Sequence, residues 1–378
     1  MKKLLLSTAV AMTFATTAQA ADPVKLGVLL GFTGAIESTV ADMGPAADMA
    51  IAEVNAAGGI LGGRKIETVR GDTTCTDSAA ATAAAERLIT SDKVQGIVGG
   101  DCSGVTTAVL TNVAVPNGMV MVSPSATSPA LTTVEDNGLF FRTAPSDARQ
   151  GAVMSDIIMG KEIKKVALTY TNNDYGKGLA DAFQKSYEAA GGKVTASISH
   201  EDGKADYSAE VGALAAAGGE VLVVAGYVDQ GGKGIIQGSL DTGAFDTFVL
   251  PDGMASNKLG EAIGSDLDGS FGQTPGANNA GAQVFEKSAK GFNGTGPFTK
   301  ETYDAAALIM LAMEAAKSSD PKDYKSKIMD GANAPGVQLN PGELKWGLLI
   351  LANGGDIDYV GASNVELIGV GESAGNYR

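Results

Sequence analysis

The chain has 378 residues, 44% of them hydrophobic, and a formal net charge of −15. Clustered lysine and arginine would be needed to neutralise phosphates, so this acidic balance argues against a nucleic-acid-binding protein. The same excess of negative charge is typical of a soluble monomer. With one histidine and two cysteines, the chain offers few soft metal ligands, and we expect neither a metal nor a cofactor.

The first twenty residues have the features of a signal peptide. Lys2-Lys3 precede an apolar run from Leu4 to about Ala15, and Ala18-Gln19-Ala20 is a small-residue cleavage site. The run is too short to span a bilayer. We therefore predict that residues 1–20 are removed after Ala20 and that the rest is a soluble protein of the periplasm.

Strands and helices alternate in the next part of the chain. The first helix is expected to start at Pro45, because proline is favoured at the first helical position, and to end at Gly58-Gly59. Alternation of this kind predicts a mostly parallel sheet with right-handed crossovers. The apolar runs that predict its strands are Val24–Leu30, Lys65–Gly71, Val94–Val98, Met119–Val122 and Leu139–Arg142.

The same alternation starts a second time after residue 142. Its predicted strands are Lys165–Tyr170, Val194–Ser199, Val221–Ala225 and Phe248–Leu250. We therefore predict an α/β fold of two Rossmann-like lobes joined by a three-strand hinge. Lobe 1 is expected to comprise residues 21–142 plus about 275–364, and lobe 2 residues 143–274 plus about 365–378. A helix over Thr302–Ser318, apolar almost all round, is predicted to lie in the core.

The loop Ser123–Pro129 follows a predicted strand and is the first candidate for a ligand site. Ligands of open α/β sheets bind beyond the carboxyl ends of the strands. Ser125, Ala126 and Thr127 have small side chains, which leave backbone N–H and C=O groups reachable and add short hydroxyls. That set of groups suits a small zwitterion. The alternative is a structural turn whose polar groups are satisfied internally.

Other polar and aromatic residues recur where strands end. Ser103 precedes a helix, where N–H groups favour an anion such as a carboxylate, although it could be a plain N-cap. Asp252 follows the last strand of the second set and could hold an ammonium, or form an Asx-turn before Gly253. Tyr175, Tyr227 and Phe32 could form walls of a cleft or be ordinary core aromatics.

Cys75 and Cys102 each follow a predicted strand, so both are expected at the same edge of the sheet. Two cysteines in an exported chain favour one disulfide, which would fix the loop beside Ser103. A reactive thiol is the alternative.

Residues suited to catalysis are scarce. The single histidine, His200, is expected in a surface turn after a strand, and no GxSxG or HExxH motif accompanies it. No phosphate-binding GxxxxGK[ST] loop is present. We therefore expect no enzyme; the alternative, a hydrolase, would require His200 in a cleft.

Several short motifs, in this order and spacing, resemble the periplasmic leucine/isoleucine/valine-type binding proteins of ABC transporters, which have the type I periplasmic binding fold. The resemblance covers nearly the whole chain after residue 20. The matching segments are Val24-Lys25-Leu26-Gly27-Val28 with Thr33-Gly34, Asn55-Ala56-Ala57-Gly58-Gly59-Ile60, Cys102-Ser103, Ser123–Pro129, Asp174-Tyr175-Gly176-Lys177-Gly178 and Tyr303-Asp304-Ala305.

The resemblance implies roles for the candidate residues. Ser103 and Thr127 would bind the ligand carboxylate, while the Ser125 carbonyl and the Thr127 hydroxyl would meet its ammonium. Asp252 falls where leucine-binding members carry a glutamate that pairs with this ammonium. Tyr175 and Tyr227 match tyrosines that close the cleft, and Cys75 and Cys102 match the disulfide of those members.

Two departures bear on the ligand. Asp101 stands where leucine-binding members have an aliphatic residue, and Thr39 stands where they have an aromatic wall. A buried carboxylate without a partner is costly. An Asp101 that faced the cleft would therefore favour a ligand side chain with a donor or a positive charge.

The resemblance implies that the chain captures an amino acid between two lobes and delivers it to an inner-membrane ABC permease. The same fold could instead bind an amide or a small aromatic or organic acid, or serve a chemoreceptor as a ligand sensor. A lac-type repressor core shares the fold class, but the signal peptide argues against it.

Overall fold

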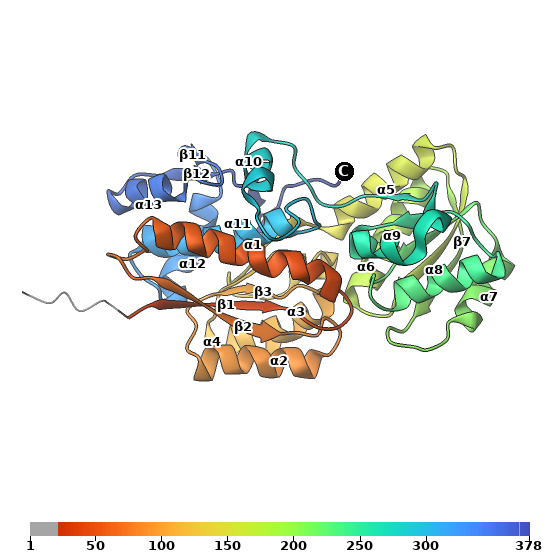
Figure 1. The fold of residues 1–378 in the computed structure, drawn as a ribbon, viewed down its shortest axis with the longest axis horizontal. Coiled ribbons are helices and arrows are strands. Elements are labelled where there is room, and N and C mark those ends of the chain that lie inside the picture. Colours follow the sequence, from red (N-terminus) through yellow and green to blue (C-terminus); the bar gives the residue numbers. More distant parts are fainter. Residues whose placement is uncertain (1–21, 370) are drawn as a thin grey trace, which may run out of the picture.

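The computed structural model describes residues 22–369 and 371–378, so the predicted signal peptide lies outside the described residues. Figure 1 shows two lobes side by side, each built on its own sheet. The first sheet has seven strands in the order β13-β14-β5-β4-β3-β1-β2, and the second has five in the order β10-β9-β8-β6-β7. Every pairing in both sheets is parallel except that of β13 with β14. The predicted class, two lobes with mostly parallel sheets, is confirmed.

The strands of the first sheet have the bounds β1 (Val24–Leu30), β2 (Ile66–Asp72), β3 (Ile97–Gly99), β4 (Met121–Ser123), β5 (Phe140–Pro145), β13 (Leu367–Ile368) and β14 (Glu372–Ser373). Those of the second sheet are β6 (Lys165–Thr171), β7 (Lys193–His200), β8 (Val221–Ala225), β9 (Phe248–Leu250) and β10 (Phe271–Gly272). A separate parallel pair consists of β11 (Val337–Leu339) and β12 (Ile357–Tyr359).

The helices of the first lobe are α1 (Glu37–Ala56), α2 (Ser78–Glu86), α3 (Ser103–Val109), α4 (Val115–Asn117), α10 (Ala280–Ser288), α11 (Thr299–Ala316), α12 (Pro321–Gly331) and α13 (Leu344–Ala352). Those of the second are α5 (Asp147–Gly160), α6 (Asp174–Ala189), α7 (Ser208–Ala217), α8 (Gly231–Thr242) and α9 (Asn257–Ile263). Helices α2 and α3 continue as π-helical segments, η1 (Arg87–Ser91) and η2 (Leu110–Ala114). Three 3-10 segments complete the set: η3 (Pro129–Thr133), η4 (Asp252–Met254) and η5 (Gly264–Leu267).

The central helix of the first lobe is α11. Every residue from Thr299 to Glu314 is buried, because α1 and α12 pack against it beside the sheet. The expected core helix over Thr302–Ser318 is therefore confirmed, with its start three residues earlier.

The start of α1 differs from the prediction. Pro45 does not begin the helix but lies inside it, eight residues after Glu37. A proline inside a helix removes one hydrogen bond and costs about 3 kcal/mol. The first two turns bury Thr39, Val40 and Met43, and this burial offsets the cost.

The end of the chain also differs from the prediction. The segment around Glu372–Ser373 was expected to join lobe 2, but β14 pairs with β5 of the first sheet, and the Arg142 N–H donates to the Gly371 carbonyl at 3.0 Å. The last residues then run beside the segment that leaves the second sheet. Thr274 and Arg378 exchange two backbone hydrogen bonds of 3.0 Å, and the Tyr377 hydroxyl donates to the Pro145 carbonyl at 2.8 Å.

The two lobes touch each other at one edge. The Asp229 N–H donates to the Ala35 carbonyl at 3.1 Å, and the Ser38 N–H donates to Asp229 Oδ2 at 2.8 Å. The hydroxyls of Ser38 and Ser256 lie 3.3 Å apart. These contacts bring the carboxyl ends of strands from both sheets toward a common space.

Candidate functional site between the two lobes

A small cavity lies where the two lobes meet. Its volume is about 20 Å³, which is room for about one water molecule. Side chains of both lobes line it: Ile36, Thr39, Asp101, Cys102, Ser103, Ser125 and Phe298 from the first lobe, and Tyr175, Tyr227, Asp252 and Gly253 from the second. Six of the nine predicted ligand-binding residues are in this set. The lining holds two aspartates and no lysine or arginine.

Serine hydroxyls form part of the first-lobe wall. Ser103 is the first residue of α3 and is buried, and its Oγ accepts a hydrogen bond of 3.1 Å from the Ser128 N–H. The Ser125 hydroxyl donates to the Asp101 carbonyl at 3.1 Å. The loop after β4 and the start of α3 therefore hold each other in place.

Ala126 and Thr127 lie in the same loop but do not line the cavity. The Ala126 carbonyl accepts a hydrogen bond of 3.1 Å from the buried Arg142 guanidinium. Thr127 is fully buried, and its hydroxyl lies close enough to the Asp147 carboxyl to lower the pKa of that group.

The second-lobe wall consists of two tyrosines and an aspartate. The rings of Tyr175 and Tyr227 stack with centroids 5.1 Å apart. The Tyr175 hydroxyl donates to Asp252 Oδ1 at 2.7 Å, and the Gly253 N–H donates to the same oxygen at 2.8 Å. Asp252 is 3% exposed, and its burial raises the pKa of its carboxyl, although these hydrogen bonds oppose the shift.

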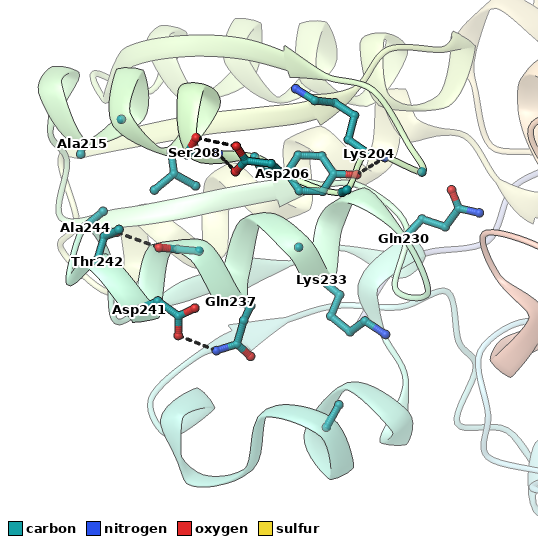
Figure 2. A pocket seen from close by; sticks show the side chains of 18 of the residues that line it. Lys204, Asp206, Ser208, Ala215, Gln230, Lys233, Gln237, Asp241, Thr242 and Ala244 are labelled. Carbon is teal, nitrogen blue, oxygen red and sulfur yellow. Dashed lines mark hydrogen bonds between the residues drawn. The ribbon is translucent and has the colours of Figure 1, made fainter.

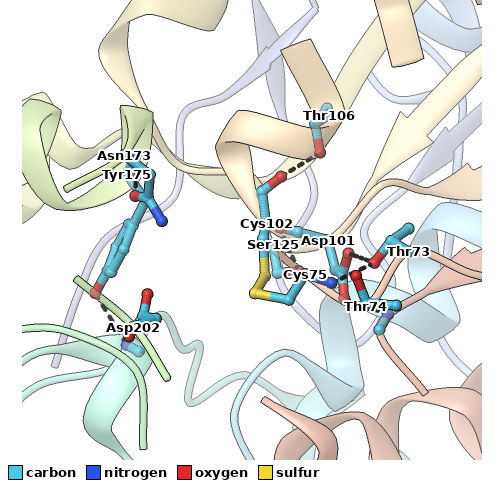
Figure 3. Close-up of a disulfide and its surroundings, with 12 residues drawn as sticks. Thr73, Thr74, Cys75, Asp101, Cys102, Thr106, Ser125, Asn173, Tyr175 and Asp202 are labelled. Carbon is cyan, nitrogen blue, oxygen red and sulfur yellow. Dashed lines mark hydrogen bonds between the residues drawn. A yellow bond between two sulfur atoms is a disulfide. The ribbon is translucent and has the colours of Figure 1, made fainter. Parts of the chain in front are cut away.

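Asp101 lies on the cavity wall, but its carboxylate is already bonded within the first lobe. One oxygen accepts from the Gly31 N–H, and the other accepts from the Thr73 hydroxyl at 2.8 Å. Figure 3 shows the carboxylate directed toward Thr73 and away from Tyr175. Burial raises the pKa of this carboxyl. Asp101 thus joins the loops after β1, β2 and β3, and gives no reason to expect a positively charged ligand side chain.

Phe32 is not brought to the cavity. Its half-buried ring lies under the Arg70 guanidinium, 4.9 Å from the ring centroid. The apolar lining comes instead from Ile36 and Phe298, which the sequence reasoning missed. Ile36 lies before the expected helix start at Pro45, in a stretch without a periodic pattern. Phe298 follows Gly296-Pro297, with no pattern that distinguishes it from any other loop aromatic.

A buried acid beside the site was also missed. Asp147 begins α5, directly after β5, and is fully buried. Its burial and then the negative charge of Asp252 raise the pKa of its carboxyl well above the usual value. No clear signal for it was present in the sequence, because the predicted strand ended at Arg142, whereas β5 continues to Pro145.

His200 was expected in a surface turn, and that prediction is wrong. It ends β7, is 1% exposed, and its Nδ1 lies 2.8 Å from the Thr169 hydroxyl. Burial lowers its pKa to about 4, so the ring is neutral at pH 7. The strand ends one residue later than predicted, and the imidazole packs against Gly231 of α8.

The two cysteines form the predicted disulfide. Cys75 and Cys102 have Cα atoms 5.2 Å apart, and Figure 3 shows the bond beside Ser125 and Asp101. Since Cys102 lines the cavity and precedes Ser103, the disulfide fixes this part of the first-lobe wall.

A larger hollow, of about 1240 Å³, lies on the second lobe between α7, α8 and the 203–208 loop (Figure 2). Its polar lining includes Lys204, Lys233 and Asp241, and none of the predicted site residues. Only second-lobe residues line it, whereas both lobes line the smaller interlobe cavity, so we place the candidate site there.

A family model described as periplasmic binding protein matches residues 23–337. The chain belongs to this family of substrate-binding proteins, and its relatives place it with the leucine/isoleucine/valine type, as the sequence resemblance predicted. The family is periplasmic. No helix within residues 22–369 and 371–378 has the length and apolar character that a bilayer crossing requires.

Curated relatives match over most of their length. The chain is 30% identical to an amino acid binding protein of Pseudomonas aeruginosa over 91% of both chains. It is 32% identical to Leu/Ile/Val-binding protein homolog 1 of Brucella melitensis, over 85% of this chain and 87% of the relative. It is 30% identical to a leucine-, isoleucine-, valine-, threonine- and alanine-binding protein of Pseudomonas aeruginosa, over 82% of this chain and 83% of the relative.

Solved structures share the fold. A branched-chain amino acid transporter substrate binding protein from Streptococcus pneumoniae, in complex with isoleucine, superposes with a TM-score of 0.76 at 23% identity, over 94% of this chain and 95% of that chain. A solute binding protein from R. palustris, in complex with benzoate, superposes with a TM-score of 0.72 at 21% identity, over 94% of this chain and 92% of that chain.

Proposed function

We propose that this protein is the substrate-binding component of an ABC importer and that it captures an amino acid between its two lobes. One observation carries the proposal: the interlobe cavity has serine hydroxyls on one wall and a carboxylate held by a tyrosine on the other. Hydroxyls and N–H groups bind a carboxylate, and an aspartate binds an ammonium. The arrangement suits a dipolar ligand.

The residue roles follow from this polarity. Ser103 and the N–H groups of the Ser123–Pro129 loop would hold the ligand carboxylate. Asp252 would pair with the ammonium, and Tyr175 and Tyr227 would cover the ligand from the second lobe. Ala126 and Thr127 would contribute backbone groups of the loop to the ligand. Thr127 would also contribute its buried hydroxyl.

The ligand side chain is proposed to be apolar and small to medium in size. Ile36 and Phe298 supply apolar surface, while the Asp101 carboxylate is occupied by Gly31 and Thr73. One relative in Pseudomonas aeruginosa is named for the binding of threonine and alanine as well as leucine, isoleucine and valine, which supports a side chain in this size range. A benzoate-like anion suits the site less well, because no lysine or arginine lines it.

Capture requires the lobes to move. A volume of about 20 Å³ is smaller than any amino acid, so the contacts between the lobes must open for entry. We propose that the lobes turn about the crossings that follow β5 and β10 and about the C-terminal segment beside them. We propose the lobe boundaries given in the sequence analysis, with β13 and β14 assigned to lobe 1 because they belong to the first sheet. The closed form would then deliver the amino acid to an inner-membrane permease.

A thermal-shift screen tests the proposal. The exported chain, cleaved after Ala20, is melted with each of the twenty L-amino acids, with simple amides, and with benzoate and 4-hydroxybenzoate. We expect leucine, isoleucine, valine, threonine or alanine to give the largest rise in Tm, since a ligand at 100 times its Kd stabilises by about 2.7 kcal/mol. A rise with benzoates alone would contradict the amino-acid assignment. An uptake assay in a deletion strain then separates transport from sensing.

A further inference from the structure

Helix α6 of the second lobe packs against the first lobe at Gly178. A Cβ atom placed on this glycine would lie 2.9 Å from Pro129 Cδ and 3.0 Å from Ser128 Oγ, both in the first lobe. Atoms of separate side chains normally pack about 3.5–4.0 Å apart. Even the smallest side chain at position 178 would therefore collide with the Ser123–Pro129 loop when the lobes are as close as they are here.

Glycine is an unfavourable choice for this position unless the contact requires it. Gly178 lies inside α6, and glycine destabilises the interior of a helix relative to alanine. Its neighbour Gly176 is explained within the second lobe, because a Cβ there would lie 2.2 Å from the Thr171 carbonyl oxygen. For Gly178, the three nearest atoms outside its own helix all belong to the first lobe. The glycine at position 178 thus fits an interlobe requirement.

The first-lobe side of this contact is held in place. Pro129 is the first residue of η3, and its ring is joined to the backbone, so it has no alternative rotamer to move away. The Ser128 N–H donates to Ser103 Oγ at 3.1 Å, and the Ser128 carbonyl accepts from Arg142 at 2.9 Å. The loop therefore cannot give way without breaking its own hydrogen bonds.

The second-lobe side is held as well. Helix α5 packs closely on α6 at Gly151, where a Cβ would lie 2.6 Å from the backbone nitrogen of Phe183. Leu179 and Phe183 of α6 are fully buried in the second lobe. Since neither α6 nor the loop can shift within its own lobe, a collision at position 178 is relieved by separation of the lobes.

The contact at Gly178 also determines the spacing of the cavity walls. Tyr175 lies three residues before Gly178, on the same side of α6, and lines the interlobe cavity. The loop on the other side of the contact contributes Ser125 to the cavity and bonds to Ser103. The distance between α6 and this loop therefore sets how close the tyrosine wall comes to the serine wall.

We propose that Gly178 is a positioning residue for capture, because its lack of a side chain lets the lobes close far enough for both walls to reach one ligand. This inference rests on the lobe closure proposed above and names the residue that permits it. When the lobes separate, position 178 moves away from the loop and has room for a side chain. A larger residue acts as a wedge that favours the open form and lowers the apparent affinity without touching the ligand.

Disulfide trapping of the closed form tests the proposal without a ligand. Ser38→Cys and Ser256→Cys are introduced together, because the two hydroxyls lie 3.3 Å apart across the lobes. The native cysteines are already bonded to each other, so the rate at which the new pair crosslinks under a mild oxidant reports how often the lobes close. In this background, Gly178→Ala should slow crosslinking by about threefold and Gly178→Leu by about tenfold or more, because overpacking grows with side-chain size.

The matched control is Gly212, an exposed glycine inside α7, where a Cβ would have no atom within 4 Å. Gly212→Ala and Gly212→Leu should crosslink at the rate of the parent pair. Equal rates for Gly178→Leu and Gly212→Leu would overturn the proposal, whether or not an amino acid binds. If Gly178→Leu does not fold, the comparison of Gly178→Ala with Gly212→Ala decides in the same way.

Calorimetry with L-leucine separates this inference from the proposed function. On the native background, Gly178→Leu should bind L-leucine about tenfold or more weakly than Gly212→Leu does. Equal affinities of the two variants would contradict the proposal. If the wild type does not bind L-leucine but crosslinking is slowed only at position 178, the role of Gly178 in closure is supported and leucine is excluded as the ligand.

Discussion

In the proposed function, single side chains of the interlobe cavity select the ligand. Asp252 follows β9 and receives hydrogen bonds from Tyr175 and Gly253, so its carboxylate is held in one orientation. The bonded tyrosine in turn stacks on Tyr227. The Asp252 carboxylate would therefore not need to reorient when a cationic group binds. This preorganisation favours tight binding.

Asp252→Ala should weaken amino-acid binding by more than a hundredfold. The reason is that removal of one partner of a buried charge pair costs about 3–5 kcal/mol, because the other charge stays buried and unpaired. Titration calorimetry with the amino acid that gives the largest thermal shift measures the effect. Asp246→Ala, an exposed acid at the opposite end of β9, is the control and should bind normally. Equal affinity in both variants would remove Asp252 from the site.

At the residue scale, the sequence predicted which residues lie near the site better than it predicted where their side chains point. Ser103, Ser125, Tyr175, Tyr227 and Asp252 follow strands at the same edges, and a parallel topology brings such positions together. The direction of a side chain depends on tertiary partners that no local pattern shows. Asp101 is turned inward by Gly31 and Thr73, and Phe32 packs under Arg70, so their contacts could not be inferred from neighbours in the chain.

Among the elements, α11 carries an ionisable group in an apolar position. Glu301 lies in its first turn and is 3% exposed, and burial raises the pKa of this carboxyl to about 7. Its backbone carbonyl accepts a hydrogen bond of 2.8 Å from the Thr143 hydroxyl of β5, where the chain leaves the first sheet. Glu301 therefore lies close to the point where the chain leaves the first sheet.

Glu301 should make the protein less stable as the pH rises. Its folded-state pKa lies above the usual value of 4.5, so its contribution to stability is complete below about pH 4.5 and is lost as the pH rises through 7. The loss is on the order of 3 kcal/mol for a shift of this size. Urea unfolding at pH 5 and pH 8 should show a smaller fall for Glu301→Gln than for the wild type. An equal fall in both would contradict the assignment.

Strand and helix positions were largely predictable because buried parallel strands are continuous apolar runs, and β1, β8 and β9 have the predicted bounds. Three elements were not. The start of α1 was predicted at Pro45, whose local preference for a first helical position is strong, whereas burial of the preceding two turns decides the outcome. The two-residue strands β13 and β14 are too short for any period to show; β14 is defined by its pairing with β5, and β13 by its pairing with β14.

For the whole molecule, the proposed capture depends on the balance between open and closed lobes. The closed arrangement is held at its edge by Asp229, which bonds to Ala35 and Ser38, and by the contact of Ser38 with Ser256. These few polar contacts suit a protein that must open again. A ligand that touches both walls adds the remaining free energy for closure, because only the closed form makes both sets of contacts.

Asp229→Ala should shift the free protein toward the open form. It removes a charge-assisted hydrogen bond between lobes, so amino-acid affinity should fall by about tenfold. Small-angle X-ray scattering of the free protein should show a larger radius of gyration, and a saturating amino acid should restore the wild-type value. Asp241→Ala, an exposed acid on α8, should behave like the wild type. A variant with unchanged radius and affinity would show that this contact does not hold the lobes together.

The disulfide makes it practical to follow the proposed lobe motion by fluorescence. The two cysteines of the chain form one disulfide, so no native thiol would react with a maleimide dye in place of an introduced cysteine. Lys177 is exposed on α6, in a groove that also includes Ser128 and Pro129 of the opposite lobe. A fluorophore on Lys177→Cys would thus change its surroundings as the groove widens, and would convert the protein into an optical sensor for its own ligand.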